Sequence, residues 1–207
     1  MLIEKMAVGP FAANCYFLQC EITKKGVVID PGDEDLRILA KIREMGVEVL
    51  KIILTHGHPD HCAGAQALQE ATDASLAMHK DDIDIANNEL FRTMLGISKK
   101  YEIKPDELLE EGQKINVGSI ELTVLSTPGH SPGSICLETS DALFSGDLLF
   151  AGGIGRSDLP GGNPKTLEES LRRIMQLDSG LKVYPGHGPV TSIGAESRGN
   201  IFLKGWI

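Results

Sequence analysis

Short apolar runs recur along the chain, and turn-forming residues separate them. The run at 49–54 (VLKIIL) is rich in branched side chains and has the length of a buried strand. The same pattern predicts strands at 2–8, 15–19, 27–29, 49–54, 75–78, 114–117, 120–125, 134–138, 142–144 and 181–184. Composition and turn residues predict helices over 34–45, 63–71 and 166–175, helix mixed with irregular chain over 80–112, a glycine-rich loop over 151–162 and a short tail. Strands interleaved with helices indicate a layered α/β domain.

The length and composition fit one globular unit. We expect a single domain over residues 1–207, because a chain of this length can bury an ample core. Acidic residues number 29 against 20 basic ones, and the net charge of -9 argues against non-specific nucleic-acid binding. No apolar run reaches the length of a membrane span, and residues 1–8 resemble a strand more than a signal peptide. We therefore expect a cytoplasmic protein with no membrane or nucleic-acid partner.

Residues 55–61, THGHPDH, are the densest group of reactive side chains in the chain. Each ring nitrogen would need a partner in a packed core, so a cluster of three imidazoles and a carboxylate is typical of a metal site. The cluster lies between a predicted strand and a predicted helix, and a glycine and a proline alternate with the ligands. Such a loop can direct His56 and His58 to one point and Asp60 and His61 to another.

Three further candidate ligands follow predicted strands: His130, Asp147 and His187. Each comes directly after a glycine, which lets the backbone turn tightly where the side chain leaves the sheet. The remaining histidine, His79, lacks this setting, and we expect it at the surface or in a satisfied structural role. Cys62 adjoins the cluster but falls on the small-residue face of the following helix, so we expect it to pack rather than to bind metal.

The ligand types indicate a reactive centre. Imidazole and carboxylate ligands without thiolate are typical of sites with open coordination positions, because closed structural zinc sites usually use cysteine. Two ions about 3.5–4 Å apart lower the pKa of a bound water towards about 7 and polarise a substrate carbonyl. Such a centre would hydrolyse a thioester or ester without a serine or cysteine nucleophile.

The order of these motifs resembles the metallo-β-lactamase superfamily. The H-x-H-x-D-H stretch at 56–61 is followed by a separate His, a separate Asp and a final His, and Asp30 in IDPG matches the opening motif. Five blocks in the family's order, from the first strand to His187, make the resemblance specific. It implies an αββα sandwich of two mixed β-sheets flanked by helices, with the metals at the sheet edge.

Within the superfamily, the chain is similar to glyoxalase II (hydroxyacylglutathione hydrolase) and to persulfide dioxygenases. The stretches TPGHSPG at 127–133, FSGDLLF at 144–150 and GGIGR at 152–156 carry this likeness.

The resemblance also implies a role for each candidate ligand. The implied sets are His56, His58 and His130 for the first metal, Asp60, His61 and His187 for the second, and Asp147 as the bridge. Asp60 and Asp147 would be the catalytic carboxylates, and Asp30 would orient the 55–61 loop from behind the ligands. We expect two divalent metal ions, with zinc as the first choice and iron or manganese as alternatives, because all three suit mixed imidazole and carboxylate ligands.

Arg156 is the candidate substrate-binding residue. It follows Asp147 by nine residues, at the position where the glyoxalase II branch places a cation for a glutathione carboxylate. The alternative is a solvated arginine or an ion pair with Asp158. Full-length glyoxalase II carries a helical domain after its last histidine, whereas twenty residues follow His187 here. The resemblance therefore implies a short-form hydrolase of thioesters such as S-lactoylglutathione, which uses a metal-bound hydroxide and accepts a broader thioester range.

Three other functions compete with this interpretation. An iron-dependent glutathione persulfide dioxygenase would use His56, His130 and Asp147 for a single iron. β-Lactam hydrolysis follows only by superfamily analogy. A non-catalytic binding module is disfavoured because every ligand position is filled. The expected partner is a small thioester, linked to glutathione or another thiol, and the sequence, including the single Trp206, predicts no oligomeric state.

Overall fold

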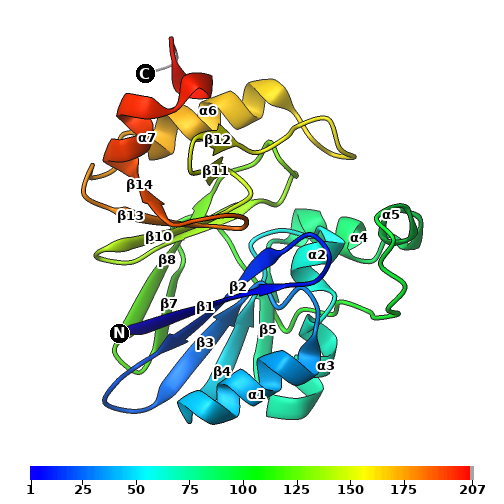
Figure 1. The fold of residues 1–207 in the computed structure, drawn as a ribbon. Helices are drawn as coiled ribbons and strands as arrows, with labels where there is room; N and C mark the ends of the chain where they lie inside the picture. The colour runs from blue at the N-terminus through cyan, green and yellow to red at the C-terminus, as the bar shows by residue number, and fades with distance from the viewer. Residues whose placement is uncertain (206–207) are drawn as a thin grey trace.

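The computed structural model describes residues 1–205, in which two mixed β-sheets pack face to face (Figure 1). Helices α1 (Asp35–Met45) and α3 (Ala65–Thr72) cover the outer face of the first sheet. Helices α6 (Pro164–Ile174) and α7 (Ile193–Gly199) cover the outer face of the second. This arrangement confirms the predicted αββα sandwich.

The first sheet contains six strands in sequence order, from β1 to β6. Their bounds are Leu2–Val8, Ala13–Gln19, Lys25–Ile29, Glu48–Ile53, Ser75–Met78 and Glu107–Leu108. Strands β3, β4 and β5 run parallel to one another, so their carboxyl ends meet at one edge of the sheet. Ligand sites in α/β proteins commonly form in the loops beyond such ends.

The second sheet also has six strands, in the order β14-β13-β10-β9-β8-β7. In chain order they are Lys114–Val117 (β7), Ile120–Ser126 (β8), Ile135–Glu138 (β9), Ala142–Gly146 (β10), Lys182–Pro185 (β13) and Thr191–Ser192 (β14). A separate two-stranded ribbon, β11 (Leu149–Phe150) and β12 (Gly153–Ile154), follows β10. Strands β10 and β13 are parallel, which places the segments after them side by side.

Short helical turns occupy the segments between the larger elements. They are α2 (Pro59–Cys62), η1 (Lys80–Asp82), α4 (Ile83–Ala86), α5 (Glu89–Met94) and η2 (Ile201–Leu203). None of the helices within residues 1–205 combines the length and the apolar character that a membrane span needs.

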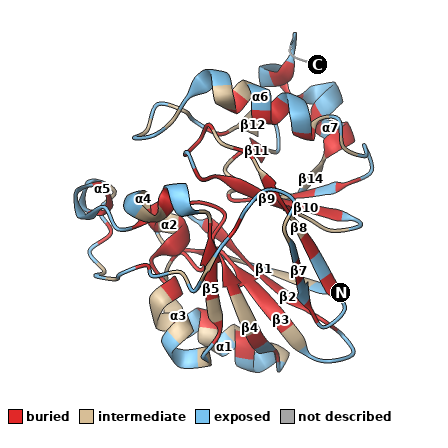
Figure 2. Cartoon of the chain, turned by 180° about the vertical axis from the view of Figure 1, so that it is seen from behind, coloured by how far each residue is buried: buried red, intermediate tan, exposed pale blue. Residues whose placement is uncertain are grey.

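Apolar side chains from both sheets form the core between them, and the exposed surface lies mainly on the outer helices and loops (Figure 2). The rings of Tyr16 and Phe144 meet edge to face with centroids 5.3 Å apart, and Tyr184 stacks on Phe144. The Tyr16 hydroxyl donates to the Pro185 carbonyl at 2.6 Å. The core is thereby tied to the strand that leads into His187.

Two expectations about local structure are wrong. The glycine-rich loop at 151–162 contains β12, and it begins just after β11. The segment after His187 is more than a short tail, since it forms β14, α7 and η2, and Ile193 and Leu203 pack in a cluster with α6. The apolar residues of the segment after His187 are too widely spaced to show a helical period in the sequence. Trp206 lies outside the described residues.

Candidate metal centre

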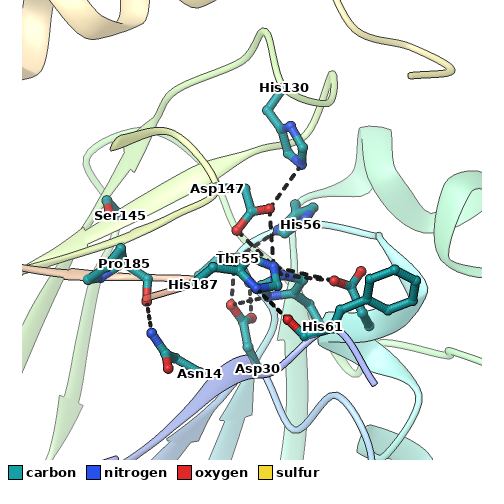
Figure 3. Close-up of polar contacts among 12 residues, drawn as sticks. Asn14, Asp30, Thr55, His56, His61, His130, Ser145, Asp147, Pro185 and His187 are labelled. Carbon is teal, nitrogen blue, oxygen red and sulfur yellow. Dashed lines mark hydrogen bonds and ion pairs between the residues drawn. The ribbon is translucent and has the colours of Figure 1, made fainter. Parts of the chain in front are cut away.

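Loops at the strand ends of both sheets bring the predicted ligands to one edge of the sandwich. Figure 3 shows five of them there: His56, His61, His130, Asp147 and His187. Strand β4 leads into His56 and His58, and α2, which begins at Pro59, carries Asp60 and His61. Proline fits this first helical position because its missing N–H would have no partner there. The other ligands follow β8 (His130), β10 (Asp147) and β13 (His187).

The first group consists of His56, His58 and His130, whose candidate ligand atoms lie within 4.8 Å of one another. Among the described residues, the buried Nε2 atom of each ring has no hydrogen-bond partner. Burial and the neighbouring rings lower the pKa values of His56 and His58, so both rings are neutral. Nδ1 of His130 donates to the Arg156 carbonyl at 2.7 Å, which leaves the Nε2 lone pair free.

The second group consists of Asp60, His61 and His187. Nδ1 of His61 donates to an Asp30 oxygen at 3.1 Å, and Nδ1 of His187 donates to the Phe11 carbonyl at 3.1 Å. The two Nε2 atoms therefore face each other, 3.1 Å apart, and Asp60 Oδ2 lies 3.4 Å from His187 Nε2. Two ring nitrogens at this separation would repel if both carried a lone pair, so the arrangement requires a proton or a metal ion between them.

Asp147 lies between the two groups. Its Oδ1 is 3.4 Å from His61 Nε2, and its Oδ2 is 3.6 Å from His130 Nε2 and 3.5 Å from His187 Nε2. A Cβ at Gly186 would come within 2.1 Å of Asp147 Oδ1, so only glycine fits beside this carboxylate. Asp147 therefore occupies the position that a ligand shared by both groups would require.

The chemistry of these atoms fits divalent cations. Buried polar atoms are normally paired, yet three ring nitrogens and Asp147 Oδ1 have no hydrogen-bond partner within residues 1–205. Burial disfavours the charged forms of Asp60 and His61, but each stabilises the charge of the other. His61 lowers the pKa of Asp60, and Asp147 and Asp60 raise the pKa of His61 to about 10. The carboxylates therefore require positive charge, which a metal ion supplies. Burial raises the pKa of the Cys62 thiol to about 12, so Cys62 packs as predicted and offers no thiolate.

Asp30 holds the 55–61 loop from behind. One carboxylate oxygen accepts from the Thr55 backbone N–H at 2.7 Å, and the other accepts from the Thr55 hydroxyl at 2.7 Å and from His61 Nδ1. The same hydroxyl contacts His56 Nδ1 at 3.0 Å. These contacts are those that the predicted orienting role requires.

The ligands open into a cleft of about 420 Å³. Its walls include the apolar side chains of Phe11, Leu95, Phe150, Ile154 and Leu159. Apolar walls around a polar floor are typical of small-molecule sites, because they exclude water while a few polar groups orient the ligand.

Arg156 lines this cleft, and the structure shows the ion pair that was its alternative interpretation. Its guanidinium makes two hydrogen bonds of 2.7 Å to Asp158, and both side chains are largely exposed. The Arg156 carbonyl also fixes the His130 ring. The sequence could not predict this backbone contact, and the role of the side chain stays a prediction.

Two residues that hold the ligand loops, Asn14 and Asp82, are not among those that the sequence predicts. Asn14 is buried and donates to the carbonyls of Pro185 and Gly188, on either side of His187. Asp82 is fully buried and contacts two ligand-bearing loops. Both depend on contacts between distant segments. His79, expected outside the site, caps η1 by accepting from the Asp81 N–H.

Known proteins match the chain along almost its whole length. It is 38% identical over 212 residues to the probable metallo-hydrolase YqgX of Bacillus subtilis, covering 98% of both proteins. It is 32% identical over 210 residues to the hydroxyacylglutathione hydrolase GloC of Haemophilus influenzae, covering 99% of both.

Solved structures agree with these relatives. The B3 metallo-beta-lactamase BLEG-1 aligns with a TM-score of 0.93 and 32% identity over 99% of this chain and 100% of that one. TTHA1623, solved in a di-iron-bound form, aligns with a TM-score of 0.89 and 38% identity over 97% of this chain and 100% of that one. ETHE1 of Myxococcus xanthus aligns with a TM-score of 0.83 and 29% identity over 97% and 84%. Since the metallo-beta-lactamase superfamily profile also matches residues 8–187, the chain belongs to that superfamily.

Proposed function

We propose that the chain is a metal-dependent hydrolase of thioesters such as S-lactoylglutathione. The observation that carries this proposal is the pair of ligand groups that meet at Asp147 below an apolar cleft. The similarity to a hydroxyacylglutathione hydrolase supports the substrate class. We propose that the site binds two divalent ions, with zinc as the first choice and iron or manganese as alternatives. The di-iron-bound form of TTHA1623 supports iron as one of these alternatives.

The bound ions would supply a water nucleophile at neutral pH and polarise the thioester carbonyl. The chain's own residues would position and shield the reaction. One ion would be held by His56, His58 and His130. The other would be held by Asp60, His61 and His187, and Asp147 would contact both ions. The apolar cleft walls would exclude bulk water from the acyl group, which strengthens the electrostatic interactions within the site.

The rim offers cations to an anionic thiol carrier. Arg156 lies at the boundary between the cleft and an adjoining pocket of about 580 Å³, which Lys165 also lines. Within residues 1–205, the Lys165 ammonium has no ion-pair partner, whereas Arg156 is paired with Asp158. We propose that both contribute to binding a carboxylate of the thiol carrier, such as that of glutathione.

The test is the loss of thioester absorbance from S-lactoylglutathione, with protein reconstituted separately and anaerobically with zinc, iron or manganese. Turnover that disappears with a chelator and in Asp147→Ala would support the proposal. The absence of turnover with every metal would refute it. A β-lactam belongs in the same substrate panel because BLEG-1 is a structural relative.

Persulfide oxidation is the second candidate, and the ETHE1 likeness favours it. His56, His130 and Asp147 adjoin one another, so one iron could use these three ligands. Oxygen uptake with iron-loaded protein and glutathione persulfide, without thioester hydrolysis, would select this function.

A further inference from the structure

Asp82 is a buried carboxylate at the end of η1, outside both ligand groups. Its Oδ2 accepts from the Gly57 backbone N–H at 2.7 Å and from the Ser131 hydroxyl at 2.5 Å. Its Oδ1 accepts from the Gly133 backbone N–H at 2.5 Å. One side chain therefore joins the loop after β4 to the loop after β8.

These two loops carry all the ligands of the first group. Gly57 lies between His56 and His58, and Ser131 directly follows His130. The second group has further contacts of its own, because His61 is oriented by Asp30 and His187 by the Phe11 carbonyl. Asp82 thus joins both loops that carry the first group, whereas it reaches the second group only through the 55–61 loop.

Close packing supports the same conclusion. A Cβ at Gly57 would lie 2.4 Å from the Asp82 carbonyl oxygen, and one at Gly133 would lie 2.8 Å from both the Asp82 nitrogen and Oδ1. Distances under 3.0 Å are not tolerated between such atoms, so both loops contact the Asp82 turn directly. The two glycines are required by the turn, not only by the bends of their own loops.

We infer that Asp82 is a positioning residue that sets the spacing of His58 and His130 and so determines metal affinity at the three-histidine group. Partners of metal ligands typically contribute 10-fold to 100-fold to metal affinity. The inference rests on the metal centre and not on the thioester substrate, so it survives if the proposed activity is wrong.

Asp82→Asn is the sharpest test because it keeps the size of the side chain. All three contacts come from donors, and a carboxamide has a single acceptor oxygen, so its NH₂ group must face a donor. Asp81→Asn is the matched control, since Asp81 is half exposed and contacts only its own turn through His79.

The measurement is zinc and cobalt binding by calorimetry, together with metal content after dialysis. We expect Asp82→Asn to bind metal about 10-fold to 100-fold more weakly at one site and to keep the other, and Asp81→Asn to match the wild type. His187→Ala removes a ligand of the second group and so shows which bound metal ion belongs to that group. We expect Asp82→Asn to retain the metal ion that His187→Ala loses.

Two results would overturn the inference: unchanged affinity at both sites, or an equal loss at both, which indicates a general structural role. If Asp82→Asn does not fold, Ser131→Ala removes one of the three bonds. It should weaken the same site by roughly tenfold, and unchanged binding would equally overturn the inference.

Discussion

Asp30→Asn should disturb the hydrogen bonds that orient the metal ligands while it leaves the backbone of the loop in place. Asp30 has a φ of 51°, in the left-handed region that asparagine also tolerates, so the backbone can stay in place. The carboxylate, however, accepts three hydrogen bonds, one at Oδ1 and two at Oδ2. An amide can reproduce these bonds at only one of its two ends.

The cost follows from the possible orientations of the amide. With the amide oxygen at the Oδ1 position, NH₂ faces His61 Nδ1, and the ring proton must move to Nε2, the atom that faces His187 and Asp147. With the amide oxygen at the Oδ2 position, NH₂ instead faces the Thr55 N–H. Either mismatch costs about 1–3 kcal/mol. At 1.36 kcal/mol per factor of ten, the mismatch at His61 corresponds to metal binding at the second group that is about 5-fold to 160-fold weaker.

Competition with a zinc chelator measures this loss. Asp73→Asn is the matched control, because Asp73 is also in the left-handed region (φ 55°) but is exposed and ends α3 away from the site. Its zinc affinity should equal that of the wild type. Wild-type zinc affinity in Asp30→Asn would refute the argument that Asp30 sets the tautomer of His61.

Three further changes test the rest of the centre. Asp147→Ala should abolish turnover and reduce metal content, measured by elemental analysis, since Asp147 contacts both groups; unchanged turnover would exclude the proposed site. Arg156→Ala should raise KM for glutathione thioesters and leave neutral thioesters nearly unchanged, and equal effects on both would remove the carboxylate role. Gly32→Ala would place a Cβ 1.7 Å from the Asp60 carbonyl oxygen, so thermal unfolding should show a loss of about 1–3 kcal/mol. Gly199→Ala, with nothing within 4 Å, is its control, and equal stability of the two variants would contradict the clash.

The candidate ligands, which the structure brings together, could be identified in the sequence because their signal is local. The composition of residues 55–61 indicates a metal site, and His130, Asp147 and His187 each follow a glycine at a strand end. Parallel pairing of β10 with β13 then places Asp147 and His187 side by side. A short sequence pattern and a sheet rule are enough for these residues.

The residues that hold the ligands could not be predicted in the same way. Asp82 lies in a stretch whose pattern predicts only helix mixed with irregular chain, yet its partners lie 25, 49 and 51 residues away. Asn14 reaches carbonyls more than 170 residues away. A hydrogen bond to a distant backbone atom leaves no pattern near either residue, because any loop can supply the N–H or C=O.

Sheet order explains why two aspartates hold the 55–61 loop from opposite sides. β4, which leads into this loop, lies between β3 and β5 in the sheet, and all three strands run parallel. Asp30 directly follows β3, Asp82 follows β5 after three residues, and each accepts a backbone N–H from the loop at a separation of 25 residues. Asp30 orients His61 of the second group, whereas Asp82 connects the loop to Ser131 beside His130 of the first. Asp30 contacts His61 directly and reaches His56 of the first group only through the Thr55 hydroxyl. Asp30→Asn should therefore weaken mainly the second metal site and Asp82→Asn mainly the first, and an equal loss at both sites in both variants would show that the loop moves as one body.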